Sequence, residues 1–97
     1  MDEQIRKIIL DRIEQPGWVA TRGVLRDPRG QFPPEEITRV EIVMKQLAQE
    51  GRVALWTLFI ENEGVALLAA ARPGLELDKD LEERGAWAKA TRYEEKT

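Results

Sequence analysis

The segment from Val53 to Ile60 is the longest apolar run of the chain, and it constrains the fold more than any other feature. Successive side chains of an extended strand point to opposite faces of a sheet. Both sets are largely apolar here: Val53, Leu55, Thr57 and Phe59 on one face, and Ala54, Trp56, Leu58 and Ile60 on the other. Each face therefore needs a cover. We expect helices on one side, and the C-terminal segment or another protein chain on the other.

An amphipathic helix is predicted immediately before this strand, from Glu35 to Glu50. Pro34 can supply the first helical position, and the acidic residues that follow it favour the positive end of the helix dipole. The apolar residues recur three or four positions apart: Ile37, Val40, Met44 and Leu47. Gly51 is suited to end the helix. After the strand, the turn 61–64 and the apolar segment 65–71 predict a β-hairpin.

The two ends of the chain carry weaker patterns. A first helix is predicted over residues 2–15 from the helical spacing of Ile5, Ile8, Ile9 and Ile13. Residues 18–20 form a short extended connector, and a brief helix is expected after Thr21, with Val24 and Leu25 facing inward. Beyond residue 74, leucines lie among acidic residues, and Gly85 should interrupt any long helix there. Residues 94–97 are expected to fray.

This order of elements resembles that of the winged helix-turn-helix superfamily. The run 38–53 is similar to the recognition helix and the entry to the wing, and the resemblance spans about residues 5–71. It implies an α+β, winged-helix-like domain over residues 1–72, with three N-terminal helices followed by a β-hairpin. Residues 73–97 would then be a C-terminal extension that packs on the domain or on a partner. Two departures stand out: the segment 27–34 is longer than a tight helix-turn-helix turn, and the wing tip carries Glu61 and Glu63, which phosphate would repel.

Composition argues against catalysis. The sequence contains no cysteine, histidine or serine, which removes the usual nucleophile triads, thiolate chemistry and zinc sites. The acidic series 78–82 begins like a calcium loop, but Glu83 stands at the position of the required glycine and Lys89 at that of the closing acid. We therefore predict no enzyme, no cofactor and no metal. The apolar runs are shorter than the ~20 residues of a membrane span, so we expect no membrane contact and a cytoplasmic location.

Association with protein is the favoured prediction for function. The chain has 18 acidic against 15 basic residues and a net charge of −3, and Ile42 is an aliphatic residue on the polar face of the predicted helix. Trp18 and Trp56 are expected in the core or at its rim. We predict a protein partner or self-association as a homodimer, through the outer face of the hairpin and the C-terminal segment. The candidate interface residues are Ile42, Trp56, Leu77, Leu81 and Trp87.

The alternative is a DNA-binding transcription regulator that uses the helix 35–50 and nearby arginines. Its candidate contacts are Arg22, Arg26, Arg29, Arg39, Lys45, Gln46 and Gln49. These side chains can hold phosphates or read base edges, but an acidic domain has little positive potential for phosphate. The same polar and charged residues are also expected on an ordinary helix face that is exposed to solvent. We favour this interpretation over DNA binding.

Overall fold

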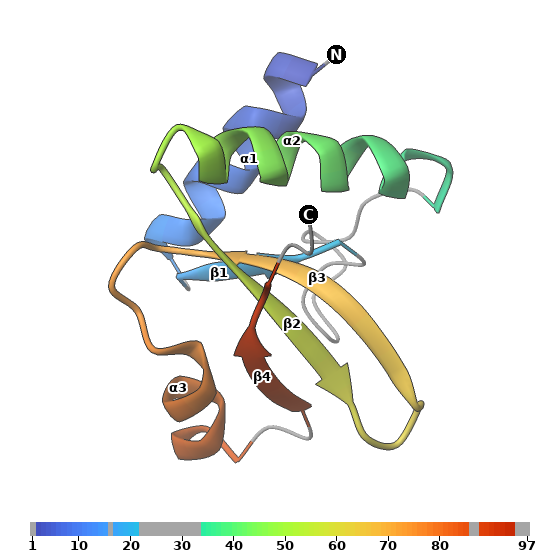
Figure 1. The fold of residues 1–97 in the computed structure, drawn as a ribbon, viewed down its shortest axis with the longest axis vertical. Helices are drawn as coiled ribbons and strands as arrows, with labels where there is room; N and C mark the ends of the chain where they lie inside the picture. The colour runs from blue at the N-terminus through green and yellow to red at the C-terminus, as the bar shows by residue number, and fades with distance from the viewer. Residues whose placement is uncertain (1, 16, 22–33, 86–87, 95–97) are drawn as a thin grey trace.

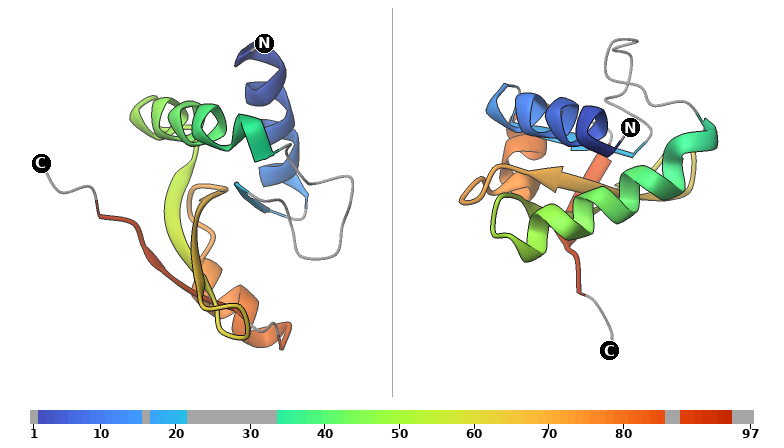
Figure 2. Two further views of the ribbon diagram at one scale, coloured as in Figure 1. Left: turned by 90° about the vertical axis from the view of Figure 1, so that its right-hand side faces the viewer. Right: turned by 90° about the horizontal axis from the view of Figure 1, so that it is seen from above.

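The chain is an α+β domain in the computed structural model, which describes residues 2–15, 17–21, 34–85 and 88–94 of the 97 (Figure 1). The described residues form these elements: α1 (Asp2–Glu14), β1 (Trp18–Ala20), the 3-10 turn η2 (Pro34–Glu36), α2 (Ile37–Gln49), β2 (Ala54–Ile60), β3 (Val65–Ala71), α3 (Leu77–Glu83) and β4 (Ala88–Arg92). In both views of Figure 2, α1 and α2 lie together, and in its left view α3 lies at the opposite end of the molecule.

The four strands form one antiparallel sheet in the order β1-β3-β2-β4. β2 and β3 are the predicted hairpin, paired from Ala54 with Ala71 to Ile60 with Val65. Gly64 adopts a φ of +65°, a left-handed conformation that favours glycine, and its N–H donates to the Ile60 carbonyl at 2.9 Å. The predicted hairpin and its turn are therefore confirmed.

Helices α1 and α2 cover one face of the sheet, as the apolar pattern of both segments predicts. Their buried residues pack with residues of the sheet in one core cluster: Ile5, Ile9, Ile13, Val19, Val40, Val43, Met44, Leu47, Val53 and Ala70. Gly51 ends α2 with a φ of +77°. Arg52 N–H donates to the Leu47 carbonyl at 2.9 Å, and Gly51 N–H donates to the Ala48 carbonyl at 3.0 Å. These two bonds make the glycine-dependent C-terminal cap that the sequence indicates.

The opposite face of the sheet is covered by the chain itself. α3 and β4 contribute to a second core cluster with β1, β2 and β3: Trp18, Ala20, Trp56, Leu58, Ile60, Leu67, Ala69, Ala71, Leu77, Leu81, Ala88 and Ala90. Two covers were expected for this face, the C-terminal segment or another protein chain, and in the structure the C-terminal segment covers it. Gly85, with a φ of +64°, follows the end of α3 as expected.

Two further predictions have different outcomes. The C-terminal segment was not predicted to contain a strand, yet β4 pairs with β2 from Ala88 opposite Ile60 to Arg92 opposite Trp56. The brief helix predicted after Thr21, with Val24 and Leu25, lies outside the described residues. Thr21 itself is buried, and its N–H donates to the Leu68 carbonyl at 3.0 Å, which continues the pairing of β1 with β3.

Candidate functional site

The outward face of α2 is the candidate site because it carries an exposed aliphatic side chain. Among the described residues, the large apolar side chains left exposed are Ile42, at 51%, and Phe59, at 43%. Val43, Met44 and Leu47 on the other side of α2 are fully buried. Thr38, Gln46 and Gln49 are exposed as well, so the helical repeat places them with Ile42 along one outward ridge.

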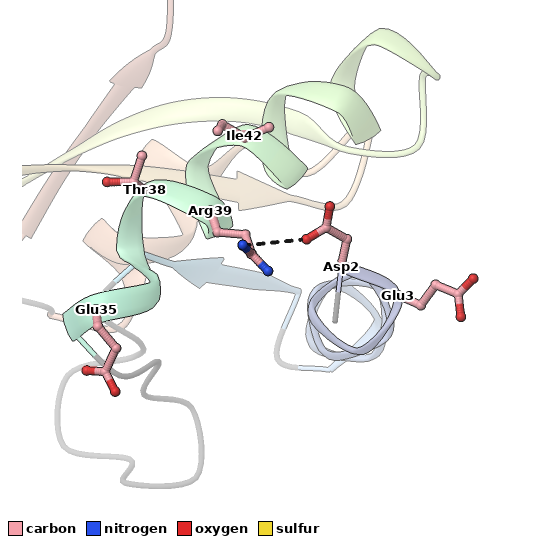
Figure 3. A pocket seen from close by; sticks show the side chains of 6 residues that line it. All are labelled: Asp2, Glu3, Glu35, Thr38, Arg39 and Ile42. Atoms are coloured by element: carbon pink, nitrogen blue, oxygen red, sulfur yellow. Dashed lines mark ion pairs between the residues drawn. The ribbon is translucent and has the colours of Figure 1, made fainter.

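The N-terminal half of this ridge borders an open hollow of about 820 Å³ between α1 and α2. Its lining residues are Asp2, Glu3, Glu35, Thr38, Arg39 and Ile42. Arg39 reaches from α2 towards α1, with its Nε 3.8 Å from Asp2 Oδ1, whereas Glu3 points away from α2 and Ile42 points outward (Figure 3). Three carboxylates and one guanidinium give the lining a net charge of −2. The carboxylates do not converge on one point.

The C-terminal half of α2 is held by contacts with distant segments. Lys45 Nζ lies 5.7 Å from the centre of the Tyr93 ring, just after β4. The two terminal guanidinium nitrogens of Arg6 on α1, Nη1 and Nη2, each donate to one oxygen of the Glu50 carboxylate at 2.9 Å. This paired hydrogen bond lowers the pKa of Glu50 and raises the pKa of Arg6. The two cations of α2, Arg39 and Lys45, therefore both have partners within the chain.

The structure corrects most of the predicted protein interface. Ile42 is exposed as predicted, but the exposed fractions of Trp56, Leu77 and Leu81 are 3%, 0% and 3%. They are buried because α3 folds back over the sheet, so their apolar surface is already covered within the domain. Trp87 lies outside the described residues. Trp18, expected in the core, is buried there.

The predicted DNA contacts fall into two groups. Arg39, Gln46 and Gln49 are exposed on α2, and Lys45 is half-buried beside Tyr93. Gln46 and Gln49 share the outward ridge, whereas Arg39 reaches towards α1 and Lys45 lies over the Tyr93 ring, so the four side chains have different neighbours. The arginines predicted to contact the DNA backbone lie outside the described residues: Arg22, Arg26 and Arg29. The expected wing tip is also more neutral than its sequence suggests, because Lys89 Nζ lies 3.1 Å from Glu61 Oε1.

Sequence reasoning missed the residues that flank the ridge. Asp2 and Glu3 lie in the first turn of α1, where acidic side chains favour the positive end of the helix dipole, and nothing in the sequence around them by itself indicates a place beside α2. The contact between Tyr93 and Lys45 joins residues far apart in the sequence and has no local signal. The acidic pattern at the start of α1 was the one clue available, since α1 and α2 were both expected to pack on the same face.

Within the described ranges, no group of three or more acidic, histidine or cysteine side chains is arranged to hold a metal ion. In the same part of the chain, no helix combines the length and apolar character needed to span a membrane. Comparison of the chain with models of protein families, with curated proteins and with solved structures found no match.

Proposed function

We propose that this chain is a non-catalytic, winged-helix-type module that acts by protein contact through the outward face of α2. The observation that carries the proposal is the 51% exposure of Ile42 on a helix that buries Val40, Val43, Met44 and Leu47 on its other side. A branched aliphatic residue surrounded by polar side chains suits the centre of a protein interface, where apolar burial supplies the affinity and a polar rim the fit.

The charges around α2 favour protein over nucleic acid. DNA affinity comes largely from neutralising phosphates with lysine and arginine. Arg39 faces Asp2, Lys45 lies over Tyr93, and the hollow beside Ile42 has a net charge of −2. Each of the two α2 cations would have to give up a contact within the chain to bind a phosphate, and the neighbouring carboxylates would repel the backbone.

DNA binding is the second candidate, because the order of elements supports it. The described part of the chain contains α1, β1, α2 and then the hairpin of β2 and β3, in that order, and the short helix that the resemblance expects before α2 lies outside the described residues. α2 would be the recognition helix, with Arg39, Gln46 and Gln49 exposed to reach base edges. α3 and β4 lie outside the span of that resemblance.

Site-specific photocrosslinking separates these functions. Benzoylphenylalanine would replace Ile42 in one variant and Phe59 in the control, since Phe59 is similarly exposed but lies on β2. Adducts formed in expressing cells at position 42, absent at position 59 and removed by protease, are expected. Adducts removed by nuclease would overturn protein contact in favour of DNA, and absence of adducts at position 42 would overturn the proposal.

A titration with duplex DNA at low salt gives an independent measurement. We expect no saturable binding by the full chain. Binding that weakens as salt rises and is lost in Arg39→Ala would instead establish the DNA-binding function.

A further inference from the structure

We propose that the partner of the α2 ridge is the α2 ridge of a second copy of this chain, packed antiparallel to it. This inference rests on the proposed function and names the partner. The two ends of the ridge carry opposite charge. Among the described residues, three acids and one base line the hollow at its N-terminal half, net −2: Asp2, Glu3, Glu35 and Arg39. Among the described residues of α1, α2 and the turn after α2, three bases and one acid lie around its C-terminal end, net +2: Arg6, Lys45, Glu50 and Arg52.

Antiparallel pairing places opposite charges together at both ends of the contact. When two identical helices pack in opposite directions about a two-fold axis, each acidic end meets the basic end of the other copy, whereas a parallel arrangement would place like charges together. Ile42 lies at the centre of the ridge, seven residues after Glu35 and seven before Gln49. The two Ile42 side chains would therefore meet near the axis, and Glu35 of one copy would face Gln49 of the other.

The size of the surface sets the strength of the dimer. One helix face with a single large exposed aliphatic residue buries less area than a standard stable interface. The dimer should therefore be weak and depend on concentration. Added salt should weaken it further, because the charges at both ends of the ridge are exposed and subject to screening.

Position 49 offers a matched pair of variants. Gln49 is exposed on the last turn of α2 and has no role in either core cluster. In Gln49→Lys, the new ammonium would face Glu35 of the second copy, so dimerisation should tighten about two- to tenfold from the two symmetric pairs. In Gln49→Glu it should weaken by a similar factor. Combining Glu35→Lys with Gln49→Glu should recover the affinity that Gln49→Glu alone loses, because the lysine of one copy would then face the glutamate of the other.

Sedimentation velocity of the full-length chain from about 10 μM to 1 mM would measure these dissociation constants. Ile42→Asp should be monomeric throughout, with circular dichroism showing that this half-exposed position leaves the fold intact. A monomeric wild type, or equal effects of lysine and glutamate at position 49, would overturn the inference. Protein adducts from position 42 with a mass other than that of a second copy would also overturn it, while leaving the proposed protein-contact function standing.

Discussion

Leu81→Ala tests whether α3 closes the second face of the sheet. Leu81 is 3% exposed in the cluster that contains Trp56 and Leu77. The substitution removes three carbon groups, and at about 0.8 kcal/mol each their burial contributes about 2.4 kcal/mol. The remaining cavity adds to this loss, although a seven-residue helix can shift to fill part of it. We therefore expect the free energy of unfolding to fall by about 2.5–3.5 kcal/mol.

Urea unfolding followed by tryptophan fluorescence and circular dichroism would measure this loss. With a slope of about 1 kcal/mol per molar urea, the midpoint should fall by about 2.5–3.5 M. Ile42→Ala is the control, since a half-exposed position should change stability by less than about 0.5 kcal/mol. If Leu81→Ala is no more destabilising than this control, α3 does not pack on the sheet. The outer face of the hairpin would then be open to a partner after all.

Three further predictions concern local contacts. Gly51→Ala should lower the free energy of unfolding by about 1–2 kcal/mol, measured in urea, because a φ of +77° strains any side chain; no loss would contradict the proposed helix cap. Glu50→Gln should lower Tm near neutral pH, and the difference from wild type should shrink as the pH falls. The reason is that Arg6 lowers the folded pKa of Glu50, so this stabilisation is present above the ordinary carboxyl pKa and disappears below the folded one; a constant difference down to about pH 3 would refute this. Arg92→Gln should cost about 0.5–1 kcal/mol in the same urea assay, because the guanidinium carbon lies 4.9 Å from the centre of the Trp56 ring; an unchanged midpoint would show that this contact contributes nothing.

The hairpin and the two longer helices were predictable because their signals are local. The change from helical to alternating spacing at Gly51 marks the end of α2 and the start of β2, and the structure has both boundaries within one or two residues. The need for a cover on each side of β2 was also predictable. Which segment supplies the second cover was left open, because two-sided apolarity indicates burial and not the identity of the neighbour.

β4 was missed for a physical reason. Its buried residues are Ala88 and Ala90, which are too small to produce a clear apolar alternation, and its register depends on β2, about thirty residues earlier. The candidate site, too, was predictable from the sequence only in part. The exposure of Ile42 follows from its position on α2, whereas the contacts of Asp2 and Tyr93 with that helix depend on how distant segments pack.

Away from the exposed Phe59 on β2, helices α1, α2 and α3 cover the large apolar side chains of the sheet, which narrows the surfaces through which the described part of the chain can bind another protein. A partner can then add to a sheet edge or contact a helix. β4 is an edge strand of five residues with Lys89 and Arg92 exposed, and short, charged edges disfavour the addition of another strand. β1, at the other edge, has three residues, all buried. The exposed aliphatic residue on α2 is neither on a short, charged edge strand nor buried. The covering of the sheet by α3 therefore strengthens the case for α2 as the contact surface.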